Sequence, residues 1–203
     1  MLLIVGHKGN MGKRYQQVCR DLGIKFRGVD LDDKIAYDGI THILIATPTH
    51  THKKMYDRIR KRFSGLILCE KPFSKNLDEI IPVYDDENLF IVNNYQYIKN
   101  YNKPKKDDIE TVYRYFNSGK DGIHFDCIQM YYLAKDEVRL SHDTAVWQCR
   151  INGSNISRFM IDVSYIYMIE HFMYGKIRFG YDRKKYYEAH LQAKRATNND
   201  IQG

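Results

Sequence analysis

The sequence predicts an α/β fold, in which a doubly wound parallel sheet is followed by a small α+β domain with a mainly antiparallel sheet. Three observations predict this arrangement. Short apolar runs alternate with helical segments over residues 1–95, which is typical of a parallel sheet. Residues 99–108 are polar and charged, as expected of a connection between domains. Asn152-Gly153 then indicates a two-residue hairpin turn. We therefore expect domains over residues 1–98 and 99–203.

The first domain is predicted from runs that suit buried parallel strands. Leu2 to Val5 is wholly apolar, and parallel strands covered on both faces have such sequences. Asn76 can cap a short helix that runs to about Tyr84. The predicted strands are 2–5, 26–30, 42–46, 66–69 and 89–92, and the predicted helices are 13–22, 50–63 and 76–84.

The second half has a different pattern. Strand-like runs over 109–116 and 138–151 flank a predicted helix at 124–135, and a returning strand is expected over 155–164. Residues 165–173 and 177–181 flank Gly175 as a further hairpin, and a polar, weakly helical tail follows about residue 182.

Three glycines directly after the first strand indicate a phosphate site. Gly6, Gly9 and Gly12 precede a predicted helix. Such glycines permit a tight turn, the close approach of a pyrophosphate, and tight packing of helix against strand. The free N–H groups and the positive dipole end of the following helix attract the anion.

Asp30 ends the second strand and lies 18 residues after Gly12. That spacing is close to the ~20 residues expected for a carboxylate that binds the adenosine ribose hydroxyls. A carboxylate there repels a 2′-phosphate, so NAD(H) is favoured over NADP(H), and the nearby Arg27 moderates the preference. The alternative is an ordinary loop acid, since Asp32 and Asp33 follow.

Composition excludes several classes of protein. The formal charge is +7, but the basic residues are dispersed among acids, which argues against nucleic-acid binding as the main function. No apolar run approaches the ~18 residues of a membrane span, and the first residues are strand-like, without the layout of a signal peptide. The four cysteines show no metal-ligand spacing. We expect reduced thiols, no metal, and a cytoplasmic protein.

Three motifs, each at the matching position along the chain, resemble those of a known family. GHKGNMG begins at Gly6, ATPTHTH at Ala46, and LCEKP at Leu68. Together they closely resemble the Gfo/Idh/MocA family of nicotinamide-dependent oxidoreductases over about residues 1–95. The resemblance implies an N-terminal Rossmann domain joined to an open-faced antiparallel sheet. The second domain, at roughly 100 residues, is shorter than is common in the family.

The resemblance, with the strand ends, assigns the candidate site. The resemblance implies that Lys71 of the EKP motif lies near the nicotinamide and the substrate hydroxyl. The alternative is that Lys71 forms a structural salt bridge. His52 is either a cofactor contact or packing at a helix start. The predicted cofactor-binding residues are Gly6, Gly9, Asn10, Met11, Gly12, Asp30, Ala46, Thr47, Pro48, His52, Glu70, Lys71 and Asn93.

The family's G-x-H turn is matched by Gly122-Ile123-His124, so His124 is the candidate for proton transfer. The family's acids are displaced here: Lys120 occupies one position and Cys127 the other, and Asp126 is the candidate substitute. The predicted catalytic residues are therefore Lys71, His124 and Asp126.

The resulting hypothesis is an NAD(H)-dependent oxidoreductase that acts on a hydroxyl or carbonyl carbon of a sugar-like substrate, or on an imine or conjugated double bond. The alternative is a catalytically weak or inactive dinucleotide-binding protein whose second domain serves oligomerisation or partner binding. Because an open sheet leaves an apolar face to be covered, a homodimer is expected.

Overall fold

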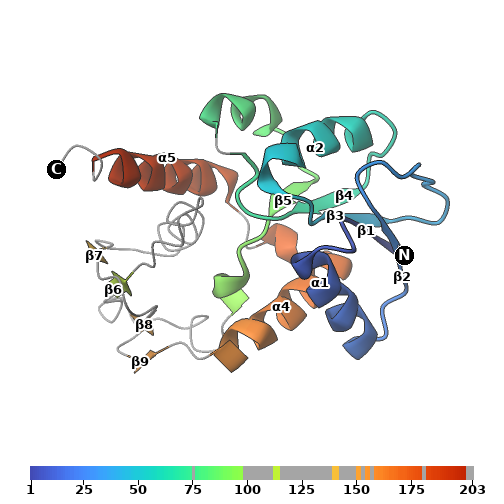
Figure 1. Ribbon diagram of the computed structural model, residues 1–203, viewed down its shortest axis with the longest axis horizontal. Helices are drawn as coiled ribbons and strands as arrows, with labels where there is room; N and C mark the ends of the chain where they lie inside the picture. The colour runs from blue at the N-terminus through green and yellow to red at the C-terminus, as the bar shows by residue number, and fades with distance from the viewer. Residues whose placement is uncertain are drawn as a thin grey trace. The chain divides into compact units, whose positions relative to one another are not determined.

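The computed structural model describes residues 1–74, 76–97, 112–114, 139–141, 150–151, 154–155, 158–179 and 182–199. A five-stranded sheet in the order β2-β1-β3-β4-β5 forms the centre of the N-terminal part (Figure 1). All of its pairings are parallel, as the sequence predicts. The strands are β1 (Leu2–Val5), β2 (Phe26–Val29), β3 (His42–Ile45), β4 (Leu66–Cys69) and β5 (Leu89–Ile91).

The strands are aligned at their carboxyl ends. Val5 lies opposite Val29 on one side and Ile45 on the other, Ile45 lies opposite Cys69, and Cys69 lies opposite Ile91. Every side chain of β1 is fully buried, because this central strand has neighbours on both sides and helices above and below. The residues that follow each strand therefore share one edge of the sheet.

Two helices on opposite faces cover the sheet. α1 (Asn10–Asp21) connects β1 to β2, and α2 (His52–Arg60), which follows the 3₁₀ turn η1 (Thr49–Thr51), connects β3 to β4. Since these two connections run in opposite directions along the sheet and crossovers are right-handed, the helices lie on different faces (Figure 1). Each buries one stripe, with Tyr15 on α1 and Met55 on α2.

The helix predicted to start at Asn76 is present only as two 3₁₀ turns, η2 (Leu77–Glu79) and η3 (Ile81–Val83). The Asn76 side chain accepts from the N–H of Asp78, so the predicted cap is correct. Pro82 lies within η3 and has no N–H to continue a longer helix.

The strands predicted over 155–164, 165–173 and 177–181 are wrong for the described residues from 158 onward. Residues Arg158–Met173 form helix α4, and Lys176–Phe179 form the 3₁₀ turn η5. Buried positions on α4 recur at Tyr165, Met168, Ile169 and Phe172, which is the spacing of one helix face. Taken alone, the β-branched and aromatic composition of this segment indicates a strand. Burial of one face against the sheet stabilises a helix instead.

α4 packs on the same face as α1. The Tyr165 ring meets the Tyr15 ring edge-on with centroids 5.7 Å apart. The Phe172 ring lies 5.0 Å from the His42 ring of β3 and 6.3 Å from the Phe90 ring of β5. A segment remote in sequence thus completes the core beneath the parallel sheet.

The remaining elements only partly match the expected antiparallel sheet. β6 (Val112–Arg114) and β7 (Arg139–Ser141) pair in parallel, against that expectation. β8 (Arg150–Ile151) and β9 (Ser154–Asn155) pair antiparallel with Ile151 opposite Ser154, as the hairpin prediction requires. The helix predicted over 124–135 lies outside the described residues. The tail forms helix α5 (Arg183–Asn199), which confirms its predicted helical character.

Contacts group the chain into two units, residues 1–92 with 165–181 and residues 93–164 with 182–203. In the second unit, Asn94 Nδ2 donates to Ser164 Oγ at 2.8 Å. Among the residues with described structure, no helix has the length and apolarity needed to cross a membrane.

Candidate functional site

The glycine turn after β1 is held by close backbone contacts. Gly6 has a φ of 88°, and its N–H donates to Val29 O at 2.8 Å. A Cβ on Gly6 would lie 2.7 Å from Ala46 O, and one on Gly12 would lie 2.2 Å from Gly6 O. The protein's own packing therefore requires glycine at both positions.

Gly9 differs from these two glycines. It caps α1 with a φ of −68° and a ψ of 168°, a conformation open to any L-residue. The nearest atom to a Cβ there is Gly6 O at 3.4 Å, an ordinary contact. Among the described residues only Gly6 O and Ala46 O lie within 4 Å of this position, so a ligand can approach the backbone at Gly9 closely.

The start of α1 also fits an anion. No side chain caps it, and its first turn holds no acidic residue, although the first N–H groups of a helix lack partners within it. These N–H groups and the positive helix end are the donor set that a pyrophosphate requires. The start of α1 at residues 9–12 therefore fits the phosphates of a dinucleotide.

Asp30 follows β2, and two side chains of the glycine turn lie beside its carboxylate. Its Oδ2 lies 3.1 Å from Lys8 Nζ and 3.7 Å from His7 Nε2. The turn that follows is held instead by Asp33, whose Oδ2 accepts from the N–H of Asp30 at 2.7 Å. The Asp30 carboxylate is therefore not needed for the loop, and it remains part-exposed at 29%.

His7 and Lys8 were not foreseen as partners of Asp30. The His7 ring rests on Gly28, where a Cβ would lie 2.5 Å from the imidazole Cγ. Gly28 in a strand was the available signal, since glycine in a strand often marks a close approach. Metal-type ligand atoms of His7, Asp30 and Asp33 lie within 4.8 Å of one another. The Asp30 carboxylate already lies beside Lys8, and the Asp33 carboxylate already accepts from the Asp30 N–H.

Glu70 of the EKP motif is buried, with 6% of its surface exposed. Its N–H donates to Ile45 O at 2.8 Å, so it continues the sheet by one residue. Its Oε1 accepts from the Tyr15 hydroxyl at 2.5 Å, and its Oε2 accepts from the Lys71 N–H at 3.1 Å. Burial first, and then the charge of Glu70, raises the pKa of Tyr15 well above its usual value, so this phenol is a donor at neutral pH.

This contact joins α1 to the segment that carries Lys71. Tyr15 lies on α1, and Glu70 and Lys71 follow β4. Both carboxylate oxygens of Glu70 already accept from other donors. Tyr15 was missed by sequence reasoning, because a tyrosine on a buried helix face resembles ordinary core.

The edge of the sheet brings the predicted residues into one row. The first residues after the aligned strand ends are Asp30 after β2, Gly6 after β1, Ala46 after β3 and Glu70 after β4. Neighbouring strands lie ~4.8 Å apart, so the row from β2 to β4 spans roughly 14 Å. Dinucleotides bind across this edge in open parallel sheets.

Comparison with known sequences supports this arrangement. Residues 3–87 match the oxidoreductase family with an NAD-binding Rossmann fold, GFO_IDH_MocA. Over these residues the chain is similar to the NAD-binding Rossmann domain of the Gfo/Idh/MocA oxidoreductase family. A search of curated protein sequences found no match.

Solved structures share the fold of this chain. The WlbA (WbpB) dehydrogenase from Thermus thermophilus, in complex with NAD and UDP-GlcNAcA, aligns with a TM-score of 0.66 at 14% identity, over 95% of this chain and 92% of that one. A myo-inositol dehydrogenase from Corynebacterium glutamicum gives 0.67 at 13%, over 95% and 94%. The UDP-N-acetylglucosamine 3-dehydrogenase GnnA from Acidithiobacillus ferrooxidans gives 0.67 at 12%, over 96% and 95%. At these identities the likeness shows the fold alone.

His52 is almost fully buried, with 1% exposed. Its Nδ1 lies 2.8 Å from Pro72 O and its Nε2 lies 2.7 Å from Thr47 O. Burial lowers the pKa of His52 despite these carbonyls. The ring therefore connects the segment after β3 to the EKP segment, which favours packing over direct cofactor contact.

The other predicted residues are distributed as follows. Ala46 and Thr47 are buried at the end of β3, and the Thr51 hydroxyl donates to the Thr47 hydroxyl at 2.8 Å. Asn93, in the second unit, is 1% exposed, and neither its Oδ1 nor its Nδ2 has a hydrogen-bond partner among the described residues. His124 and Asp126 lie outside the described residues.

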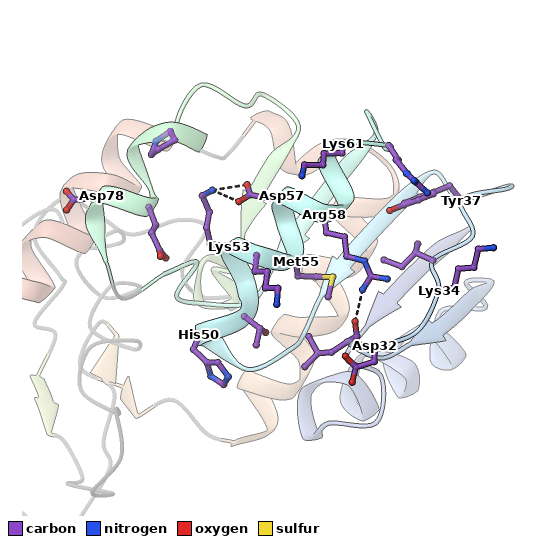
Figure 2. Close-up of a pocket in the computed structure, with 17 residues that line it drawn as sticks. Asp32, Lys34, Tyr37, His50, Lys53, Met55, Asp57, Arg58, Lys61 and Asp78 are labelled. Atoms are coloured by element: carbon purple, nitrogen blue, oxygen red, sulfur yellow. Dashed lines mark hydrogen bonds and ion pairs between the residues drawn. The ribbon is translucent and has the colours of Figure 1, made fainter.

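A hollow of about 1150 Å³ flanks α2, between the 31–37 loop and the turn that contains Asp78 (Figure 2). None of the predicted site residues in the described part of the chain lines it. Across it, the Arg58 guanidinium donates to Leu31 O at 2.6 Å and to Asp33 O at 2.7 Å. Arg58 thereby holds the loop after Asp30 against α2.

Proposed function

We propose that this chain is an NAD(H)-dependent oxidoreductase that transfers hydride between nicotinamide and a hydroxyl or carbonyl carbon of a small sugar-like substrate. The observation that carries the proposal is the anchoring of the EKP segment. Glu70 holds the Lys71 N–H and is itself held by Tyr15 of α1. The backbone of Lys71 is thereby connected, through Glu70, to the helix whose N-terminus fits the diphosphate.

Lys71 is the proposed catalytic residue on the described part of the chain. In the proposed reaction its ammonium binds the reacting oxygen of the substrate and polarises the carbon–oxygen bond. A positioned cation of this kind favours negative charge on that oxygen as the hydroxyl proton leaves. Bound NAD(H) supplies the hydride acceptor or donor, and the protein supplies orientation and electrostatics.

Proton transfer is assigned to His124, with Asp126 as its orienting acid. This assignment comes from the G-x-H turn of the sequence. An imidazole exchanges a proton near neutral pH, which suits it to take the hydroxyl proton in one direction and return it in the other.

A sugar-like substrate is the proposed class. The family profile covers oxidoreductases. The structural relatives include proteins named as dehydrogenases of myo-inositol and of UDP-N-acetylglucosamine, and one structure in complex with UDP-GlcNAcA. These three compounds are the first substrates to test.

The first experiment separates binding from turnover. NADH binding is measured by fluorescence titration, and NAD⁺ reduction is then followed with the three compounds. Lys71→Ala should lower turnover at saturating cofactor by ~10²-fold or more, the contribution typical of a positioned proton-transfer group, while NADH still binds. Lys25→Ala is the matched control, because Lys25 is exposed and lies just before β2 at the opposite end of the sheet.

The outcomes discriminate between the hypotheses. Absence of NADH binding overturns the proposal. Binding without turnover on a wide sugar panel, unaffected by Lys71→Ala, supports the alternative of a dinucleotide-binding protein without catalysis. We also propose a homodimer, and a monomer mass by light scattering at micromolar concentration would contradict it.

A further inference from the structure

We propose that Lys8 makes this site accept NADP(H) as well as NAD(H), by moving from Asp30 to the 2′-phosphate of the adenosine ribose. The inference rests on the proposed dinucleotide binding and concerns the selectivity of that same site. It departs from the expectation that Asp30 favours NAD(H) over NADP(H).

The charge of Asp30 is balanced before any ligand arrives. A lone carboxylate at the end of β2 repels a 2′-phosphate, which is the physical basis of selection for NAD. Here Asp30 Oδ2 faces Lys8 Nζ at 3.1 Å and His7 Nε2 at 3.7 Å. The Lys8–Asp30 pair is neutral as a unit, so the repulsion that would exclude the phosphate is reduced.

The position and the exposure of Lys8 allow its side chain to move. It stands between Gly6 and Gly9 in the turn that fits the diphosphate, and its side chain is 74% exposed. An exposed lysine–carboxylate pair is held weakly, and a lysine is a flexible point charge that binds phosphate well. The ammonium can therefore exchange the carboxylate for a more highly charged partner at little cost.

Arg27 does not fill this role. Its guanidinium donates to Ala36 O, so it is held on the 31–37 loop. The His7 ring lies against Gly28, with its Nε2 3.7 Å from Asp30 Oδ2. Of the side chains with described contacts to Asp30, the exposed Lys8 has the freedom to reach a phosphate.

The test compares NADH and NADPH by fluorescence titration for the parent, Lys8→Gln, Asp30→Asn and the exposed control Lys25→Gln, in a buffer that contains a metal chelator. We expect the parent to bind the two cofactors within about tenfold of each other. Lys8→Gln should weaken NADPH about tenfold while NADH changes less than about twofold, because a charge-assisted contact to the phosphate is lost. Asp30→Asn should favour NADPH, and Lys25→Gln should change neither affinity.

Ionic strength gives an independent readout. The part of NADPH binding that depends on Lys8 should decline with added salt more steeply than NADH binding does, because screening acts on exposed charges. If NADH binds but NADPH is more than about 100-fold weaker, or if Lys8→Gln weakens both equally, the inference is wrong and the proposed function stands. If neither cofactor binds, both fail.

Discussion

Gly9→Ser should raise stability and weaken dinucleotide binding, two effects of opposite sign from one side chain. The backbone at Gly9 already has the extended conformation of a helix cap, with a φ of −68° and a ψ of 168°. Serine is a preferred cap, because its hydroxyl accepts from the N–H groups of the first turn. The new Cβ would meet only Gly6 O at 3.4 Å and Ala46 O at 3.9 Å, so the fold can accommodate it.

The expected gain is small. The better cap contributes a few tenths of a kcal/mol, and removing a glycine from the unfolded chain contributes ~0.4–1 kcal/mol. For a chain of this size, 1 kcal/mol corresponds to a rise in melting temperature of about 2–4 °C. The side chain would fill the space that we assign to the diphosphate and would occupy its N–H donors. We expect NADH affinity to fall at least about tenfold, or ~1.4 kcal/mol.

Thermal unfolding by circular dichroism measures the first effect, and NADH fluorescence titration measures the second. Gly12→Ala is the contrasting variant, because its Cβ would lie 2.2 Å from Gly6 O. It should lose more than about 2 kcal/mol of stability through overpacking. If Gly9→Ser binds NADH as the parent does, or unfolds as readily as Gly12→Ala, the distinction drawn between these two glycines is incorrect.

Three further predictions follow from buried side chains. Tyr15→Phe should lower the free energy of unfolding by about 1–3 kcal/mol at pH 7 in urea unfolding, because Glu70 loses a donor. The pKa of Tyr15 is raised above 10, so the parent should also lose stability as the pH rises past 10, and it should lose more than the variant does. Burial lowers the pKa of His52 below 6.5, so the parent should lose stability as the pH falls below 6.5, and melting curves of His52→Gln should show less of this dependence. Burial raises the pKa of the Cys19 thiol to about 12 and that of Cys69 well above its usual value, so peptide mapping should find both unlabelled by a thiol reagent at pH 8 unless denaturant is present.

The parallel sheet could be predicted because its signals are local. Each strand is a short run of apolar residues bounded by polar or glycine-rich segments, and the alternation with helices fixes the class of sheet. The order of the candidate residues along the edge follows from that class, since each comes directly after a strand. Gly6, Asp30 and Glu70 are found there as expected.

α4 shows where local signals fail. Ile161, Val163 and Tyr165 have strand-forming side chains, yet they lie in a helix. The faces of the segment become distinguishable only when Phe172 packs against His42 and Phe90. Those two residues are remote in sequence, so no window along the chain contains the information.

By itself, the sequence determined the strand ends, the glycine turn and the position of the EKP motif, because these depend on neighbouring residues and on strict spacing. Only the tertiary structure decided which atoms hold the site together. Tyr15 reaches Glu70 across 55 residues, and His52 joins Thr47 to Pro72. Lys8 neutralises Asp30 because the crossover brings the first turn beside the second strand. A hydrogen bond or ion pair requires atoms within a few ångströms of each other, and folding alone sets that distance.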